Sequence, residues 1–218
     1  MAKIFRSLLV LAFSITLGAC SSVPRTYQLE AGARYESYSE KPAESLATSL
    51  SRELGSPVMI LFGDPTHIKS TAGGFQVGVT EKAKNLLTRI TVYNQTFESV
   101  NYTFLYKGIP ISETLNPTAW GFDVSIGYQL WWFRPQMSYK YEFLKMNTVV
   151  NSPTGALTMD MSQKNFFIGG GLAFDVPLSD SVALVTQADY RVPVNANGAE
   201  ISSTTFQAGI RMFKWNPK

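Results

Sequence analysis

The sequence predicts an all-β protein of antiparallel, up-and-down strands, mainly because apolar and polar residues alternate along it. In the twelve residues from Trp120 to Trp131, one face is wholly apolar, and the other carries only glycine or polar residues from Gly121 to Gln129. Successive side chains of a strand point to opposite faces, so this pattern predicts a two-faced strand. The segment is long for a soluble strand, but its length suits a tilted strand that crosses a membrane.

The same alternation recurs along the chain after residue 26. The further segments are 27–36, 75–80, 137–143, 168–176, 182–192 and 204–212. No apolar run of about 18 residues follows the N-terminal segment, which excludes a helical membrane protein. Repeated long strands therefore predict a barrel or a sandwich.

Alternation alone does not say which face is inside. The polar faces mix glycine with charges of both signs, which suits a narrow lumen better than a solvated surface. The apolar faces carry Tyr, Trp and Phe near the strand ends, as membrane barrels do at the two lipid–water boundaries. A closed barrel also lets strands pair every backbone group within hydrocarbon. We therefore expect a transmembrane β-barrel, with a soluble barrel as the alternative.

Connection lengths predict the orientation and the strand number. Short turns are expected at 131–135 and 177–181, and longer connections at 108–118, 147–157 and 195–202. Outer-membrane barrels have short periplasmic turns and longer external loops, so both termini are expected in the periplasm and the strand number is even. Eight strands result if Leu86 to Lys107 is one bulged strand. Ten result if Val58 to Phe62 is a short strand and Asn94-Gln95-Thr96 is a turn.

Residues 40–71 are expected to form an excursion outside the barrel, in the first long connection. Pro42 suits a first helical turn and Gly55 a helix end. Between them, apolar residues share one helical face, which predicts a short helix. These residues are Ala43, Leu46, Ala47, Leu50 and Leu54.

The N-terminus carries an export signal. Lys3 and Arg6 precede an apolar run from Leu8 to Leu17, which is too short to cross about 30 Å of hydrocarbon. The run ends in Leu17-Gly18-Ala19-Cys20, and Cys20 is the only cysteine of the chain. We expect a signal peptide at 1–19, a lipid anchor and tether at 20–26, and a barrel domain at 27–218.

The ending Leu-Gly-Ala-Cys resembles the lipobox of bacterial lipoproteins. The resemblance implies cleavage before Cys20 and attachment of lipid, such as palmitate, to that cysteine. Ser21 after the cysteine implies, by the same resemblance, sorting to the outer membrane.

Composition excludes several classes of function. The chain has a net charge of +3, which falls to +1 once Lys3 and Arg6 leave with the signal. A binder of nucleic acid needs a concentrated basic face, so no nucleic-acid partner is expected. No cofactor is expected either. His67 is the sole histidine, and one histidine with no free thiol predicts no metal site.

An interior network of charges is the main candidate site. An eight-stranded interior is just wide enough for side chains to fill it, and buried charges must be paired. We expect a salt-bridged plug, whereas a ten-stranded ring would favour a narrow ion path. The residues are Glu30, Arg34, Glu36, Arg89, Asp123, Lys140, Glu142, Asp175, Asp189, Arg191 and Arg211.

The C-terminal half resembles a known group. Residues 167–191 hold a glycine-rich strand, a Pro-Leu-Ser-Asp-Ser turn and Gln-Ala-Asp-Tyr-Arg, and residues 206–211 read Phe-Gln-Ala-Gly-Ile-Arg. These segments are similar to the last strands of small outer-membrane β-barrels of the OmpA/OmpX type. The resemblance implies an outer-membrane barrel, although Asn216-Pro217-Lys218 departs from the aromatic ending usual in that group.

The expected function is that of a lipid-anchored outer-membrane barrel with a plugged lumen. It would be structural or would bind surface partners through external loops, with outer-membrane lipid as its surroundings and without enzymatic activity. Three alternatives stay open: a lipid-modifying hydrolase, a narrow pore, and a soluble lipoprotein barrel that binds a ligand. The hydrolase would depend on His67, with Asp64 and Ser70 nearby in sequence.

Overall fold

The computed structural model describes residues 24–41, 51–52, 55, 58–62, 68–194 and 200–215, and nearly all of them lie in antiparallel strands. The strands are β1 (Arg25–Lys41), β2 (Val58–Phe62), β3 (Ile68–Ala83), β4 (Leu86–Phe97), β5 (Val100–Tyr106), β6 (Ile109–Tyr128), β7 (Phe133–Ser152), β8 (Gly155–Pro177), β9 (Ala183–Pro193) and β10 (Glu200–Trp215).

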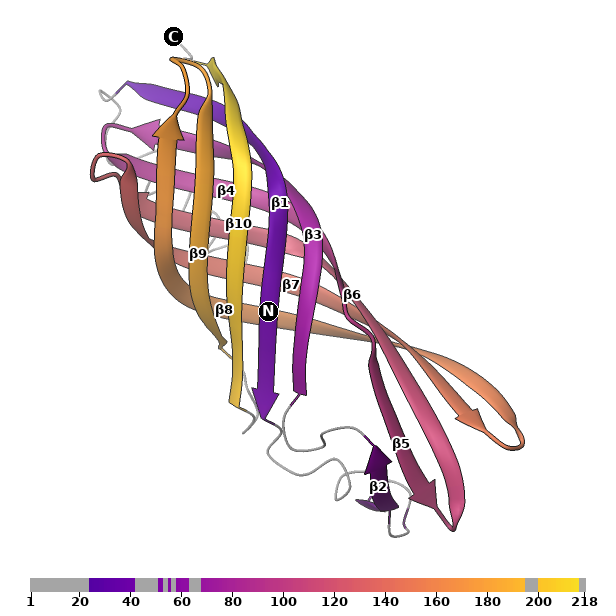
Figure 1. The fold of residues 1–218 in the computed structure, drawn as a ribbon. Helices are drawn as coiled ribbons and strands as arrows, with labels where there is room; N and C mark the ends of the chain where they lie inside the picture. The colour runs from indigo at the N-terminus through magenta and orange to yellow at the C-terminus, as the bar shows by residue number, and fades with distance from the viewer. Residues whose placement is uncertain are drawn as a thin grey trace, which may run out of the picture.

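Eight of these strands close into a ring (Figure 1). Their order is β6-β4-β3-β1-β10-β9-β8-β7, and β7 pairs back to β6. The first and last strands of the chain form one seam, where Ala33 of β1 lies opposite Ala208 of β10. Closure leaves the ring without a free edge.

Strands β4 and β5 act as one interrupted strand. Both pair with β6, and only Glu98 and Ser99 separate them. The expectation of an eight-stranded ring, with residues 86–107 as one bulged strand, is therefore confirmed. Strand β2 exists but pairs with β5 outside the ring, and Asn94-Gln95-Thr96 lies inside β4 rather than in a turn. The ten-stranded ring is therefore wrong.

Strands β5 to β8 continue beyond the ring as a projecting sheet. Strand β9 pairs with β8 only as far as Phe167, whereas the β7–β8 pairing continues to Ser152 and Gly155. Figure 1 shows the β5–β6 and β7–β8 hairpins running out past the ends of β1, β10 and β9. We call residues 100–117 and 145–164 the projection.

The long connections expected at 108–118 and 147–157 are wrong, because these residues belong to the strands of the projection. The outer part of β8 is exposed, whereas Tyr102 and Phe104 of β5 and Thr148 of β7 are buried, so burial is uneven along the projection. Its first hairpin turns at Lys107 and Gly108, with φ angles of 52° and 77°. Such positive φ values at both central residues are those of a tight hairpin turn.

The end of the ring opposite the projection has three short connections: 84–85, 129–132 and 178–182. We call this the turn end and the other the loop end. The chain enters β1 at Arg25, opposite Ala83, and leaves β10 at Trp215, opposite Tyr27. Both ends of the ring's chain therefore lie at the turn end.

Other expectations fall on residues outside those that the structure describes. These are the signal peptide at 1–19, Cys20, the connection at 195–199 and most of the predicted helix. Of the helix, only Ser51 and Arg52 are described, and they are helical. The excursion is shorter than 40–71, because β1 continues to Lys41 and β3 begins at Ile68. No helix among the described residues is long and apolar enough to cross a membrane.

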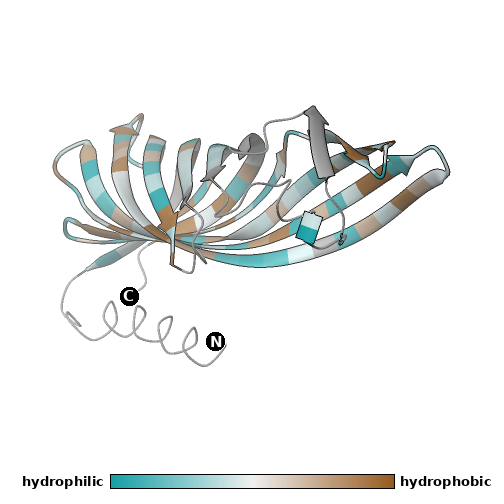
Figure 2. Ribbon diagram, turned by 90° about the horizontal axis from the view of Figure 1, so that it is seen from below, coloured by the Kyte–Doolittle hydropathy of each residue, from teal (hydrophilic) through white to brown (hydrophobic). Residues whose placement is uncertain are grey.

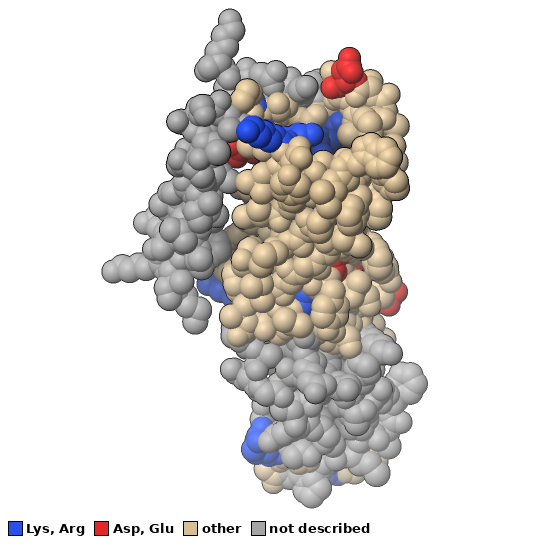
Figure 3. Space-filling model, turned by 90° about the vertical axis from the view of Figure 1, so that its left-hand side faces the viewer, with Lys and Arg blue, Asp and Glu red and all other residues tan. Residues whose placement is uncertain are grey.

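The polarity of the ring is the reverse of that of a soluble barrel. On β3, Phe75 and Val77 point outward and are 63% and 52% exposed, whereas Gln76 between them is 1% exposed. Leu184 and Ile210 also lie outside. Figure 2 shows hydrophobic and hydrophilic residues alternating along the strands. On the face drawn in Figure 3, a broad uncharged band lies between charged side chains gathered mainly above and below it.

Two neighbouring glycines of β3, Gly73 and Gly74, differ in how closely the adjacent strand approaches them. A Cβ added at Gly74 would overlap the carbonyl oxygen of Asn94 and lie 2.7 Å from Cα of Gln95, whereas one at Gly73 would meet nothing within 4 Å. We predict that Gly74→Ala lowers the free energy of unfolding in urea by about 1–3 kcal/mol, as overpacking does. Gly73→Ala should change it by less than about 0.5 kcal/mol. Equal effects in detergent micelles would contradict this explanation.

Candidate functional site

The lumen of the ring holds a network of buried charges, because the polar positions of every strand point inward. All eleven predicted residues lie there, and a twelfth, Arg134, lies with them. Six members are acidic and six are basic, so the described network is neutral overall. The twelve are Glu30, Glu36, Asp123, Glu142, Asp175, Asp189, Arg34, Arg89, Arg134, Lys140, Arg191 and Arg211.

Arg34 of β1 is a hub in the loop-end half. Its guanidinium donates to Asp123, to Glu36 at 3.0 Å and to the side-chain oxygen of Gln95 at 3.0 Å. The guanidinium carbon also lies 3.9 Å from the ring centroid of Tyr93. Carboxylates on two strands and an aromatic face thus enclose a fully buried cation.

Lys140 of β7 is the second hub of this half. Its ammonium pairs with Glu36 and, at 2.6 Å, with Glu142, and it lies 4.7 Å from the ring centroid of Phe167. Glu36 also accepts from Ser203 of β10, which links β7 to the β1–β10 seam. The network therefore ties the strands together across the lumen as well as around the ring.

Arg191 of β9 completes the loop-end half. It pairs with Asp189 at 3.1 Å and with Asp123 at 3.6 Å, and donates to Ser138 and Thr205 at 3.0 and 2.8 Å. This half contains three cations and four carboxylates: Arg34, Lys140 and Arg191 with Glu36, Asp123, Glu142 and Asp189.

The turn-end half has the opposite balance. Arg89 pairs with Glu30, and Arg211 bridges Glu30 at 3.3 Å and Asp175 at 3.1 Å. Arg134 approaches Asp175 at 3.5 Å but makes no hydrogen bond within the described part of the chain. Three cations therefore face two carboxylates.

Two glutamines separate the halves. Gln187 and Gln207 accept from Arg89 at 2.8 and 2.7 Å. On their other side, Gln187 donates to Asp189, and Gln207 donates to Asp123 at 3.3 Å. Amide groups, which accept and donate at once, suit a boundary between a cationic and an anionic layer.

Arg134 was missed because residues 131–135 were expected to form a turn. In the structure β7 begins at Phe133, so Arg134 is already on the strand. Its lumen position follows from extending the polar face of 137–143 backwards by two steps, through Gln136. The requirement for a neutral interior was a second signal, because the eleven predicted charges leave one carboxylate in excess.

An aromatic cluster lies across the loop end of the lumen. Tyr38 makes edge-on contacts with Phe97 and Phe167, with centroid distances of 6.2 and 6.0 Å. Ala72, Ala119 and Leu144 pack with them. We call this cluster the cap.

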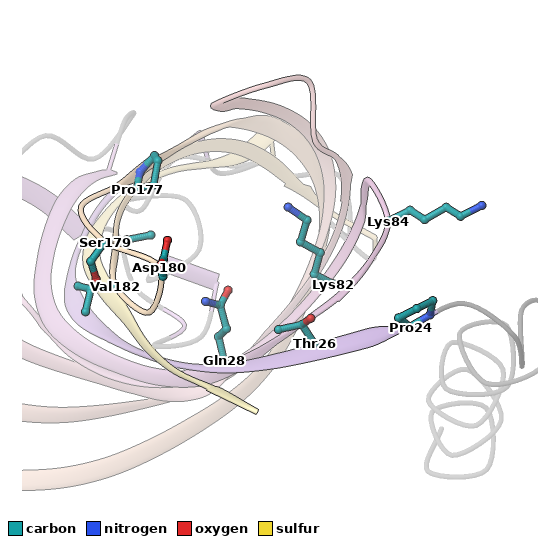
Figure 4. Close-up of a pocket in the computed structure, with 10 residues that line it drawn as sticks. Pro24, Thr26, Gln28, Lys82, Lys84, Pro177, Ser179, Asp180 and Val182 are labelled. Carbon is teal, nitrogen blue, oxygen red and sulfur yellow. The ribbon is translucent and has the colours of Figure 1, made fainter. Parts of the chain in front are cut away.

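The turn end instead has an open mouth of about 380 Å³. Figure 4 looks into it and shows Gln28, Lys82 and Asp180 directed inward, whereas Lys84 points away. The lumen is therefore asymmetric, with an apolar cap at one end and a polar mouth at the other.

The residues of the hydrolase hypothesis are not assembled here. Asp64 and His67 lie outside the described residues, and Ser70 is a buried residue of β3. Among the described residues, no group of three or more His, Cys, Asp or Glu is suited to a metal ion.

The fold and the site define a small β-barrel with an apolar exterior and a charged interior. No protein-family model matches the sequence, and no curated protein matches it. Solved structures with a similar fold are small outer-membrane β-barrels. Ail, the attachment invasion locus protein of Yersinia pestis, is 9% identical over 86% of this chain and 99% of its own, with a TM-score of 0.45.

Two others are similarly distant in sequence. The N-terminal β-barrel domain of Pseudomonas aeruginosa OprF is 9% identical over 83% of this chain and 97% of its own, with a TM-score of 0.42. Neisserial surface protein A is 10% identical over 85% of this chain and 96% of its own, with a TM-score of 0.40. At such identities the likeness concerns the fold alone.

Two lysines of β7 test the energetic role of the network. Lys140→Met leaves Glu36 and Glu142 without their shared cation, so we predict a loss of about 3–5 kcal/mol in the free energy of unfolding. Lys145 pairs with Asp160 at 3.8 Å on the exposed projection, and Lys145→Met should cost at most about 1 kcal/mol. Urea unfolding in micelles, followed by tryptophan fluorescence, measures both. Similar losses for the two variants would contradict the prediction.

Proposed function

We propose that this protein is a lipid-anchored outer-membrane β-barrel that serves as a non-enzymatic scaffold and presents its projection to surface partners. The observation that carries the proposal is the polarity of the ring, with apolar side chains outside and paired charges inside. In water, that exterior would be an exposed apolar patch far larger than the apolar patches on soluble proteins. Hydrocarbon is the solvent in which this arrangement is stable.

Strand lengths support a membrane location. A membrane-crossing strand needs about 9–11 tilted residues. Strands β9 and β4 have 11 and 12 residues, and β1, β3 and β10, which also stay outside the projection, have 17, 16 and 16. Each of these ring strands is therefore long enough to cross a bilayer, and the projection extends beyond that span.

Aromatic residues lie where the two lipid–water boundaries would be. At the turn end, Tyr128, Trp131 and Trp132 are exposed. Toward the loop end, Trp120 and Tyr190 are exposed on the outer face. Amphipathic rings favour the headgroup level, so two such rows support an embedded ring.

The chain ends support the proposed anchor and orientation. Arg25 begins β1 at the turn end, and Cys20 precedes it by only five residues in sequence. A lipid on Cys20 would therefore enter the leaflet next to the short turns. In the orientation typical of outer-membrane barrels this is the periplasmic side, so the projection would lie outside the cell.

The cap and the projection support scaffolding rather than conduction. The cap packs aromatic rings across the loop end, and the buried network occupies the lumen below it. Beyond Phe166, strand β8 pairs only with β7 among the described strands, so one edge of the projection is open to a partner. Open edges pair readily with extended segments of other chains.

The proposed lipid contact is testable with a fluorophore on the ring. In a Cys20→Ser background, we place an environment-sensitive label on Val77→Cys of the outer face, and a matched control on Thr158→Cys of the projection. After folding into vesicles, lipids with brominated chains should quench the label at 77, and aqueous iodide should quench the label at 158. The proposal is wrong if iodide, and not brominated lipid, quenches the label at 77.

The proposed anchor is testable separately. Cells expressing the wild-type chain should incorporate labelled palmitate into the protein, and Cys20→Ser should abolish this incorporation. The variant should still resist extraction from membranes by alkaline carbonate, because the ring itself is embedded. Release of Cys20→Ser into the soluble fraction would instead support a soluble lipoprotein barrel held by its lipid alone.

A further inference from the structure

The two halves of the lumen carry opposite excess charge. The turn-end half holds Arg89, Arg134 and Arg211 against Glu30 and Asp175, so one positive charge is uncompensated there. The matching negative excess lies beyond Gln187 and Gln207. An uncompensated buried charge is costly, and an amide layer does not neutralise it.

Arg134 is the residue whose positive charge is least compensated in this half. It is 1% exposed, and none of its three guanidinium nitrogens has a hydrogen-bond partner in the described chain. Its nearest carboxylate, that of Asp175, already accepts from Arg211 at 3.1 Å. The Nε atoms of Arg89 and Arg211 also have no partner there. Within the described residues, five buried guanidinium nitrogens of the turn-end half are therefore unsatisfied, against one unsatisfied carboxylate oxygen there, Oδ1 of Asp175.

We propose that the turn-end half of the lumen binds a small oxyanion such as inorganic phosphate, held mainly by Arg134. Water could accept some of these hydrogen bonds, but it would leave the charge uncompensated, whereas an anion satisfies both requirements. A planar guanidinium binds oxyanions through two parallel hydrogen bonds, which favours an oxyanion over a spherical ion.

The mouth at the turn end supplies the route. Gln28, which lines it, is two positions from Glu30 on β1, and Lys82 is two positions from Thr80, whose hydroxyl lies 3.5 Å from Glu30. Figure 4 shows Lys82 directed into this opening. The cap lies across the other end, and the paired strands of the ring separate the lumen from lipid headgroups at the side. The ligand is therefore a free anion from the aqueous phase at the turn end.

The experiment measures binding of radiolabelled inorganic phosphate to the folded protein in micelles, by equilibrium dialysis at fixed ionic strength. We expect saturable binding to the wild type, and affinity at least about tenfold weaker for Arg134→Met, the equivalent of one lost charged hydrogen bond. Lys84→Met is the matched control, since it removes the same charge near the mouth from a side chain that points away. It should bind as the wild type does.

Three outcomes would overturn the proposal: no saturable binding to the wild type, unchanged binding to Arg134→Met, or equal losses in Arg134→Met and Lys84→Met. If Arg134→Met does not fold, two milder variants replace it. Arg134→Lys keeps the charge but removes the guanidinium fork, and Lys82→Met removes a cation from the route. Both should weaken binding, and wild-type affinity in both would also reject the site. Because the measurement is made in micelles, its result is independent of the lipid anchor and of the cellular location.

Discussion

Closure of the ring by the β1–β10 pairing is the constraint on which the rest of the structure depends. Once the strands close, one face of each must point into a space barely wider than the side chains themselves. The alternation makes that face polar, so charges are packed together away from water. They are tolerable there only as a paired network, and the side chains of that network join strands that are not neighbours in the ring.

The same constraint explains the glycines of the polar faces. In so narrow a ring, inward positions approach the backbone of the adjacent strand. At Gly121 and Gly171, a Cβ would overlap the carbonyl oxygens of Tyr141 and Ala188. Glycines and large guanidinium groups therefore occur together in the lumen, because the guanidinium groups occupy the volume that the glycines leave free.

The lumen is neutral as a whole but is not uniform along its axis. At the loop end, cations and an excess of carboxylates lie beneath an apolar cap, and each cation has several partners. At the turn end, arginines are in excess beside an open, polar mouth. A network that only supported the barrel would work equally well with cations and carboxylates balanced at both ends of the lumen. Arg134 lies 3.5 Å from Asp175 but makes no hydrogen bond in the described chain. It is therefore the part of the interior that structural support explains least, and an anion from the mouth would explain it.

Alternation determined most of what was predictable: the all-β class, the approximate position of the ring strands and the eleven inward charges. These follow from local rules, since side-chain direction has a period of two whatever the strand pairs with. The projection was not predictable in this way. Thr158, for example, lies in a part of β8 that is exposed at successive positions, so no alternation marks a strand there. Arg134 was hidden for a related reason, because strand ends are set by pairing partners rather than by composition.

By itself, then, the sequence determined that strands with one apolar and one polar, charge-bearing face would form. Which charges meet, and where the excess of each sign falls, were decided only by tertiary structure. The physical reason is that pairing across a lumen depends on strand order and stagger. Those bring together residues as distant as Glu30 and Arg211, and no local pattern in the chain records such a contact.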